Sequence, residues 1–299
     1  MDASELKSRL THAADLAQCV DAVGRYFAGY DLCYGHGTET PDDEAYWLVW
    51  QLGGMPEDLT GIAAGAELVE RITELAVQRA EQRIPLAYLL GVAWFAGLEF
   101  EVNRDVLIPR SPLAELIESH FEPWCALGAG DRVLEIGTGS GCIAIAAAVH
   151  NPAIEIDATD IAPGALRTAR ANILRHDVAD RVRLEAADLF PDGDQRYRVI
   201  ISNPPYVPTR VIASLPAEYS HEPSAALDGG ADGLDAVRRI LEGAGQRLAG
   251  DGVLIVEVGL AEAALVSAFP GVPWTWLEFE RGGEGVFLLT ADQVRDGWG

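Results

Sequence analysis

The sequence has 299 residues, of which 49% are hydrophobic and 23% charged. This length and composition suit one or two globular domains and exclude a chain that is disordered throughout. The formal net charge of -24 disfavours unaided binding to nucleic acid, because an acidic chain repels the phosphate backbone. Such a charge suits a basic protein partner, although acidity also serves solubility alone.

Neither a metal site nor a membrane segment is predicted. The four cysteines form no CxxC pair, and the six histidines form no HxH or HExxH cluster. The N-terminus lacks the basic and apolar stretches of a signal peptide, and no apolar run reaches about 18 residues. We therefore expect a cytoplasmic protein without a metal ion.

Residues 1–92 are expected to form a small helical domain. Apolar residues recur at the spacing of one helix face over Leu68–Arg79. A second apolar run, Tyr46–Trp50, is followed by a glycine- and proline-containing turn at residues 53–56. These patterns favour helices over strands in this part of the chain.

The chain changes character before Pro109. Short apolar stretches around Gly97 and Asn103 predict a β-hairpin. We assign residues 93–111 to a hairpin linker and place the domain boundary near residues 105–112.

Residues 112–299 alternate between short apolar strands and helices. The expected strands are Arg132–Ile136, Ile154–Asp160, Val182–Asp188, Tyr197–Asn203 and Gly252–Gly259, and the expected helices are Cys142–Val149, Pro163–Arg175 and Leu234–Leu248. Two further strand-like segments, Trp274–Arg281 and Gly285–Thr290, predict an antiparallel hairpin. The fold class is therefore α/β, a Rossmann-like, mostly parallel doubly wound sheet with an antiparallel edge.

A glycine-rich turn, Glu135–Gly141, joins the first of these strands to a helix. Glycines let the chain turn tightly while its backbone approaches a ligand. The dinucleotide pattern GxGxxG is not met, because Cys142 stands where its last glycine or alanine would be. The acidic residue followed by GxGxG instead resembles the first motif of class I methyltransferases. A purely structural turn is the alternative.

Two aspartates stand at the ends of the next two strands. Asp160, followed by Ile161, can accept hydrogen bonds from both hydroxyls of a ribose, and a helix N-cap is the alternative. Asp188 and the Leu189 backbone can meet the edge of an adenine, because ligands of such sheets lie beyond the carboxyl ends of the strands. A turn aspartate before Pro191 is the alternative for Asp188.

The segment Asn203-Pro204-Pro205-Tyr206 follows the fourth strand, where a substrate group can face the methyl group of the cofactor. The Asn203 side chain offers one acceptor, and the rigid proline segment fixes a neighbouring carbonyl as a second. Two acceptors in one plane match the two N–H donors of an amide or an exocyclic amine, and Tyr206 can stack on the flat group. Each hydrogen bond contributes about 1 kcal/mol, whereas positioning can remove about 7–11 kcal/mol from the barrier. A proline-rich turn that ends a strand is the alternative.

Together these motifs resemble the protein glutamine-N5 methyltransferases, over nearly the whole chain. That family joins a small helical substrate domain to a Rossmann-like methyltransferase domain through a hairpin linker. Its two bacterial branches act on release factors and on protein three of the large ribosomal subunit. The segments that resemble the ribosomal-protein branch are residues 34–38, 93–97, 109–112, 215–223, 276–279 and 282–287.

The resemblance implies S-adenosylmethionine as cofactor and a basic large-subunit ribosomal protein as substrate, methylated on a glutamine side-chain amide. It implies that the three glycines cradle the methionine part, that Asp160 takes the ribose, and that Asn203 and Pro204 grip the substrate amide. Glu135 stands where relatives can have aspartate, a change that we expect to be harmless. The expected cofactor-binding residues are Glu135, Gly137, Thr138, Gly139, Gly141, Asp160, Ile161, Asp188, Leu189 and Asn203, and the expected catalytic residues are Asn203, Pro204, Pro205 and Tyr206.

Three other functions compete with this hypothesis. A release-factor glutamine methyltransferase would share the chemistry and differ in its substrate. An adenine-N6 DNA methyltransferase would use the same segment on a flipped adenine, but the net charge of -24 and the absence of a basic recognition segment disfavour it. A non-catalytic cofactor-binding scaffold would not need the amide clamp of Asn203.

Overall fold

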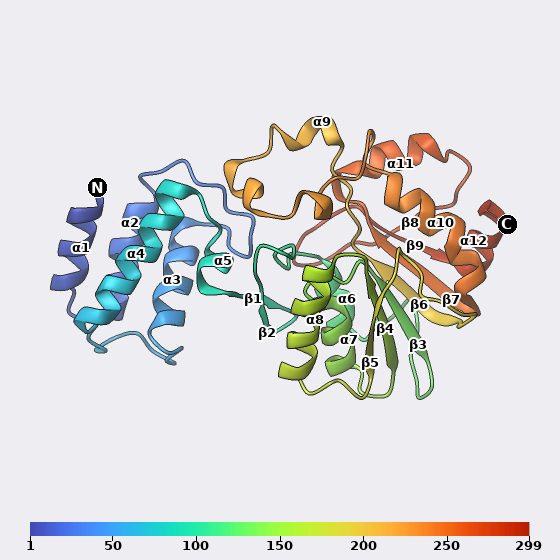
Figure 1. Cartoon of the computed structure of the whole chain (residues 1–299), viewed down its shortest axis with the longest axis horizontal. Helices are drawn as coiled ribbons and strands as arrows, with labels where there is room; N and C mark the ends of the chain where they lie inside the picture. Colours follow the sequence, from blue (N-terminus) through green and yellow to red (C-terminus); the bar gives the residue numbers. More distant parts are fainter. Residues whose placement is uncertain (299) are drawn as a thin grey trace. The chain divides into compact units, whose positions relative to one another are not determined.

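The computed structural model describes residues 1–298 and divides them into two compact units (Figure 1). The first unit comprises Met1–Val92 and the short segment Pro216–His221. The second unit comprises Ala93–Leu215 and the chain from Glu222 onward. Gly299, the last residue of the predicted methyltransferase domain, lies outside the described residues.

The first unit is helical, as its periodicity predicts. Its helices are α1 (Ala3–His12), α2 (Leu16–Phe27), α3 (Pro41–Leu52), α4 (Ala66–Gln82) and α5 (Leu86–Leu90), with the 3-10 helix η1 (Ala217–His221). The predicted helix over Leu68–Arg79 is the central part of α4. Side chains of Asp2, Asp15 and Thr40 accept hydrogen bonds from backbone amides at the starts of α1, α2 and α3.

A buried ion-pair network holds the segment Pro216–His221 within this first unit. Glu218 is fully buried, and its carboxylate accepts hydrogen bonds from Arg79 Nη1 at 3.0 Å and Arg83 Nε at 2.7 Å. The Cys33 amide donates to the same carboxylate at 2.9 Å, and Arg79 Nε also donates to Glu44 at 2.9 Å. The two guanidinium groups balance the charge of the two buried carboxylates, which makes their burial tolerable.

The second unit contains a seven-stranded sheet with the order β5-β4-β3-β6-β7-β9-β8. The strands are β3 (Arg132–Ile136), β4 (Glu155–Asp160), β5 (Val182–Ala186), β6 (Tyr197–Ser202), β7 (Leu248–Glu257), β8 (Thr275–Trp276) and β9 (Val286–Thr290). The first five are parallel, and β9 pairs antiparallel with β7 and β8. This is the predicted mostly parallel sheet with an antiparallel edge. A two-stranded hairpin, β1 (Val92–Phe95) and β2 (Leu98–Glu101), precedes it.

Helices cover both faces of this sheet. They are α6 (Leu113–Glu118), α7 (Cys142–His150), α8 (Pro163–Arg175), α10 (Asp235–Arg247), α11 (Glu262–Ala268) and α12 (Ala291–Trp298), with the short helices α9 (Thr209–Ile212), η2 (Ser224–Ala226) and η3 (Gly259–Ala261) in loops. Alternate strand residues point to opposite faces, so Val133 joins one core and Leu134 the other.

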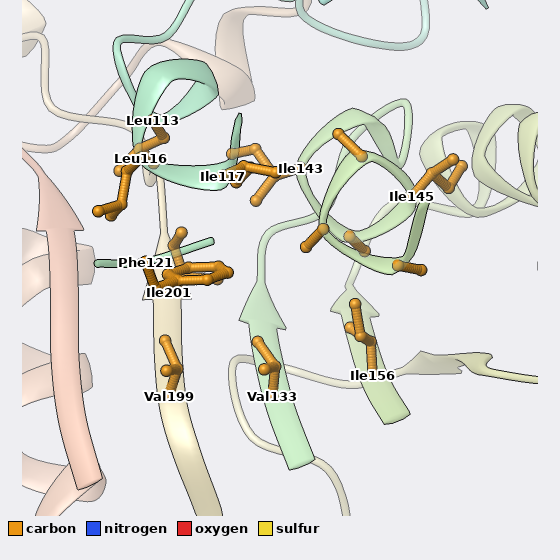
Figure 2. Packing of buried hydrophobic residues seen from close by; sticks show 14 of the residues in the cluster. Leu113, Leu116, Ile117, Phe121, Val133, Ile143, Ile145, Ile156, Val199 and Ile201 are labelled. Carbon is orange, nitrogen blue, oxygen red and sulfur yellow. The ribbon is translucent and has the colours of Figure 1, made fainter. Parts of the chain in front are cut away.

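The first of these cores lies under α6 and α7 (Figure 2). Val133, Ile156 and Val199 project from β3, β4 and β6 toward Ile117 and Ile143 on those helices. The second core packs α10, α11 and α12 on the other face. Because both faces are covered, the central strands contribute apolar side chains to both cores, as is usual for parallel sheets.

Within residues 1–298, no helix is long and apolar enough to cross a membrane. In the same residues, no group of three or more histidine, cysteine, aspartate or glutamate side chains is arranged to hold a metal ion.

Candidate active site

A cavity of about 300 Å³ lies where the direction of strand order reverses in the second unit. From β3 the chain builds the sheet toward β4 and β5, and from β6 it builds toward β7 on the other side. Loops that follow β3 and β6 therefore diverge, and they leave a crevice at the carboxyl ends of these strands. The predicted residues that line this cavity are Glu135, Gly137, Thr138, Gly139, Asp160, Ile161, Asp188, Leu189, Asn203 and Pro205.

The glycine-rich turn presents its backbone to the cavity. Gly137 and Gly139 have φ angles of +73° and +56°, a region that side chains with a Cβ disfavour. A Cβ built on either residue would meet no protein atom within 4 Å, so the space above them is open to a ligand. Gly141 differs: a Cβ there would lie 3.0 Å from Ile145 Cδ1 and 3.3 Å from Ala169 Cβ. Gly141 allows helix packing and is absent from the described residues that line the cavity.

Glu135 closes the turn onto helix α7. Its buried carboxylate accepts hydrogen bonds from Thr138 Oγ1 at 2.5 Å and from the Ala144 amide at 3.0 Å. Burial raises the pKa of Glu135 to about 8, and these two donors partly offset that rise. Through these two hydrogen bonds, the acidic residue of the motif holds the glycine-rich turn against the start of α7.

Asp160 holds the same turn from the neighbouring strand. Its Oδ2 accepts from the Gly139 amide at 2.9 Å, and its Oδ1 accepts from the Ala162 amide at 2.8 Å. Helix α8 begins at Pro163 without a side-chain cap, so Asp160 does not act as its N-cap. Each carboxylate oxygen keeps a second lone pair that can accept a ribose hydroxyl.

The third strand ends earlier than predicted, at Ala186 rather than Asp188. Asp188 lies in the following loop and pairs with Arg239 of α10 through two hydrogen bonds of 3.0 and 2.8 Å. Those bonds lower the pKa of Asp188. Leu189 has a φ of +74°, an unusual angle for a residue with a Cβ, and its carbonyl accepts from Thr159 Oγ1 at 2.6 Å. The Leu189 backbone is therefore held in place beside the cavity.

The Asn203–Tyr206 segment begins directly after β6, which ends at Ser202. Asn203 and Pro205 line the cavity, while Pro204 and Tyr206 are absent from the described lining residues. The Tyr206 hydroxyl donates to Glu257 Oε1 at 3.2 Å. Its ring packs against Gly259, where an added Cβ would lie 2.8 Å from Tyr206 Cε2. The stacking of Tyr206 on a substrate group stays a prediction.

Several residues of the site were not predicted as functional. Arg110 lines the cavity and forms two hydrogen bonds, of 2.6 and 2.7 Å, with the fully buried carboxylate of Glu222. Glu257, 4% exposed, accepts a hydrogen bond of 2.5 Å from Ser111 Oγ. Glu257 ends an apolar strand, which is the same sequence signal that singled out Asp160, so it could have been found.

The residues around the cavity fit a nucleoside cofactor with an amino-acid tail. Open space over two glycines admits a ligand close to the backbone, and Asp160 retains acceptor capacity beside it. The volume of about 300 Å³ is at the lower end of the range for small-molecule sites.

A doubly wound sheet with this glycine turn and an Asn-Pro-Pro-Tyr loop at its switch point defines a class I methyltransferase. A family model described as "Methyltransferase small domain" matches residues 114–215. Among solved structures, the hMettl16 catalytic domain in complex with a MAT2A 3′UTR hairpin superposes with a TM-score of 0.50 and 18% identity, over 78% of this chain and 85% of that one. That likeness concerns the fold.

Curated relatives carry the identification further. Ribosomal protein uL3 glutamine methyltransferases from Francisella tularensis and Xanthomonas campestris are 43% and 44% identical, over 88% and 94% of this chain and 86% and 94% of their own lengths. The protein of that name from Neisseria gonorrhoeae is 42% identical over 91% of this chain and 93% of its own length. The chain belongs to the family of ribosomal protein uL3 glutamine methyltransferases, and the expectation drawn from its motifs is confirmed.

Proposed function

We propose that this protein transfers a methyl group from S-adenosylmethionine to the side-chain amide nitrogen of a glutamine in ribosomal protein uL3. The observation that carries the proposal is the position of Asn203 at the cavity wall, directly after β6 and beside the glycine turn of β3. The acceptor oxygen of the Asn203 side-chain amide can hold the substrate nitrogen next to the bound cofactor. The shared family supports the choice of substrate.

The cofactor would lie along the carboxyl ends of β3, β4 and β5. When bound, S-adenosylmethionine supplies a methyl group on a positively charged sulfur. The backbone of Gly137 and Gly139 would border its methionine part, and Asp160 would accept the ribose hydroxyls. Asp188 and Leu189 would border the adenine.

The chain's main contribution to the reaction is to position the substrate nitrogen. An amide nitrogen is a weak nucleophile because its lone pair is shared with the carbonyl. Acceptors on the Asn203 side chain and the Pro204 carbonyl would take the two N–H groups of the glutamine amide and point its nitrogen at the methyl group. Such positioning can lower a barrier by about 7–11 kcal/mol. The proton can leave after methyl transfer, so no strong base is required.

The acidic character of the chain supports a basic substrate protein. With a formal net charge of -24, the protein attracts cationic segments over long range and repels bare nucleic acid. We therefore propose that it acts on the ribosomal protein rather than through RNA contacts, and that it does so in the cytoplasm.

The test is transfer of labelled methyl groups from S-adenosylmethionine to three separate substrates. These are ribosomal protein uL3, a class-one release factor and adenine-containing DNA. Label on uL3, located to a glutamine by mass spectrometry, is the expected result. Label on the release factor alone would support glutamine methylation but contradict uL3 as the substrate. Label on DNA alone would contradict both glutamine methylation and uL3 as the substrate.

Replacing Asn203 separates chemistry from cofactor binding. Asn203→Ala should lower turnover on the order of 100-fold or more, because one acceptor for the amide is lost. Its affinity for S-adenosylmethionine, measured by calorimetry, should stay close to wild type. Near-normal turnover in this variant would contradict the amide clamp.

A further inference from the structure

Glu257 stands at the centre of a set of polar contacts behind the Asn203–Tyr206 segment. Ser111 Oγ donates to its Oε2 at 2.5 Å, and Tyr206 Oη donates to its Oε1 at 3.2 Å. The Asn203 side chain also lies within reach of this carboxylate and lowers its pKa. Three separate parts of the second unit therefore meet on one side chain at the end of β7: the linker, the loop after β6 and β7 itself.

Glu257 does not line the cavity of the candidate active site. It is 4% exposed and is absent from the described residues that line the cavity, whereas Asn203 is among them. A direct role as a base toward the substrate is thus excluded by its place. Any effect of Glu257 on the reaction must pass through its neighbours.

Fold stability does not account for a glutamate at this position. Its two direct hydrogen-bond donors are neutral hydroxyls, and the Arg110 guanidinium nearby is paired with Glu222. Burial raises the pKa of Glu257, although Ser111, Tyr206 and the charge of Arg110 act to lower it. An apolar side chain at the end of the strand Val253–Val256 would avoid the cost of removing a carboxylate from water.

The chemistry of an asparagine side chain explains why a glutamate stands at position 257. Its two ends are similar in size but opposite in hydrogen bonding, since one is an acceptor oxygen and the other a donor nitrogen. Which end faces outward is set by the surrounding hydrogen bonds. An ionised carboxylate only accepts, so it takes the N–H end and leaves the oxygen for another partner.

We propose that Glu257 is a positioning residue that orients the side-chain amide of Asn203, so that Asn203 Oδ1 faces the N–H groups of the substrate amide. This inference rests on the proposed function, because it assigns Asn203 to the substrate. Without the carboxylate, the asparagine would also adopt the opposite orientation, in which its own NH2 group opposes that of the substrate. The same contacts fix Tyr206 and Ser111 relative to Asn203.

The test compares two variants of Glu257 in the full-length protein. Glu257→Met keeps the length of the side chain and removes the acceptor, and it should lower kcat on the order of 10- to 100-fold with little change in the affinity for S-adenosylmethionine. Glu257→Gln retains one acceptor oxygen and should recover most of that loss. Equal kcat for Glu257→Met and wild type would overturn the proposal.

A matched control is Asp157→Asn. Asp157 is also buried and also accepts from a tyrosine hydroxyl, Tyr197 Oη at 2.8 Å, but it is absent from the described residues around the cavity. This variant should lower thermal stability and leave kcat unchanged. If Glu257→Met behaved in the same way, Glu257 would have only a structural role.

Two further readouts show whether Glu257 acts through Asn203. The double variant Asn203→Ala/Glu257→Met should turn over no more slowly than Asn203→Ala alone, and additive losses would contradict the proposal. In nitrogen-15 spectra recorded without substrate, the Asn203 side-chain NH2 signal, assigned by its loss in Asn203→Ala, should exchange with water faster in Glu257→Met than in wild type. Unchanged exchange would overturn the proposed orientation. Wild-type turnover on uL3 tests the proposed function separately.

Discussion

Each unit of this protein buries glutamates, and the surroundings of Glu218 in the first unit and Glu257 in the second differ. For Glu218 in the first unit, burial acts to raise the pKa, but hydrogen bonds from Arg83, the Cys33 amide and Arg79 lower it to about 2. For Glu257 in the second unit, burial raises the pKa, and the donors Ser111 and Tyr206, together with the charge of the nearby Arg110, only partly offset that rise. A carboxylate held by guanidinium groups fixes a chain segment in place. A carboxylate held by neutral donors costs stability and is better explained by the groups that it orients.

The largest expected effect is on the first unit. Glu218→Ala should reduce its stability by about 3–5 kcal/mol, because it leaves Arg79 buried with one partner fewer and Arg83 without this partner. Hydrogen exchange of α4 and of the segment Pro216–His221, followed by mass spectrometry, measures this loss.

Glu74→Ala is the control for that prediction, because Glu74 lies on the exposed face of α4 and pairs with the exposed Arg71. It should change stability by less than about 1 kcal/mol. Equal effects of the two variants would mean that the buried network does not hold the segment.

Asp160 extends the comparison to a carboxylate held by backbone amides alone. Asp160→Ala should weaken the binding of S-adenosylmethionine by about 10-fold or more, equivalent to about 1.4 kcal/mol or more, because the ribose acceptor and the support of Gly139 are both lost. Calorimetric titration checks this. Asp180→Ala, an exposed aspartate in the loop after α8, should bind as wild type does. Unchanged affinity in Asp160→Ala would contradict the ribose assignment.

The pH dependence of stability sharpens the contrast further. The pKa of Glu218 is lowered from 4.5 to about 2 in the folded protein, so its stabilising effect is complete well above pH 4.5 and is lost as the pH falls toward about 2. The stability difference between wild type and Glu218→Gln should therefore shrink by about 1 kcal/mol between about pH 7 and about pH 4. Urea unfolding at both pH values measures it. A difference that grew on acidification would contradict the lowered pKa.

The smallest effect is expected for a charge pair at the edge of the active site. Asp188 and Arg239 form two hydrogen bonds, but more than half of each side chain is exposed to water. Arg239→Ala should lower thermal stability by less than about 1 kcal/mol and weaken cofactor binding only a few-fold. A loss of binding as large as that of Asp160→Ala would show that Arg239 contacts the cofactor directly.

The order of elements in the second unit followed closely from local patterns. Arg132–Ile136 and Pro163–Arg175 coincide with β3 and α8. The predicted strand Trp274–Arg281 was too long, because only Thr275–Trp276 pairs in the sheet. Beyond it, the backbone amides of Glu280 and Arg281 donate to the Glu115 carboxylate of α6. Side-chain alternation does not reveal such a competing partner. The predicted strand Gly252–Gly259 likewise began too late, because β7 starts at Leu248. A register shift interrupts the pairing of β7 with β6 in this part of the strand.

The candidate site was predictable where a residue ends or follows a strand and carries a distinctive chemistry. Gly137, Asp160 and Asn203 meet both conditions, and all three line one cavity. Tyr206 belongs to the same motif as Asn203, yet its hydroxyl donates a hydrogen bond to Glu257, a residue distant in sequence. The partner of Arg110, Glu222, lies 112 residues along the chain, and no local pattern relates the two.

The helical first unit, the doubly wound second unit and the candidate ligand-binding residues at the strand ends could all be predicted before folding was considered, because periodicity and glycine spacing are local properties. The inclusion of Pro216–His221 in the first unit and the proximity of Glu257 to Asn203 appear only in the folded chain. Those arrangements depend on hydrogen bonds between residues far apart in the chain. The partners of a buried charge are residues that folding brings close to it, and their positions in the sequence follow no periodic pattern.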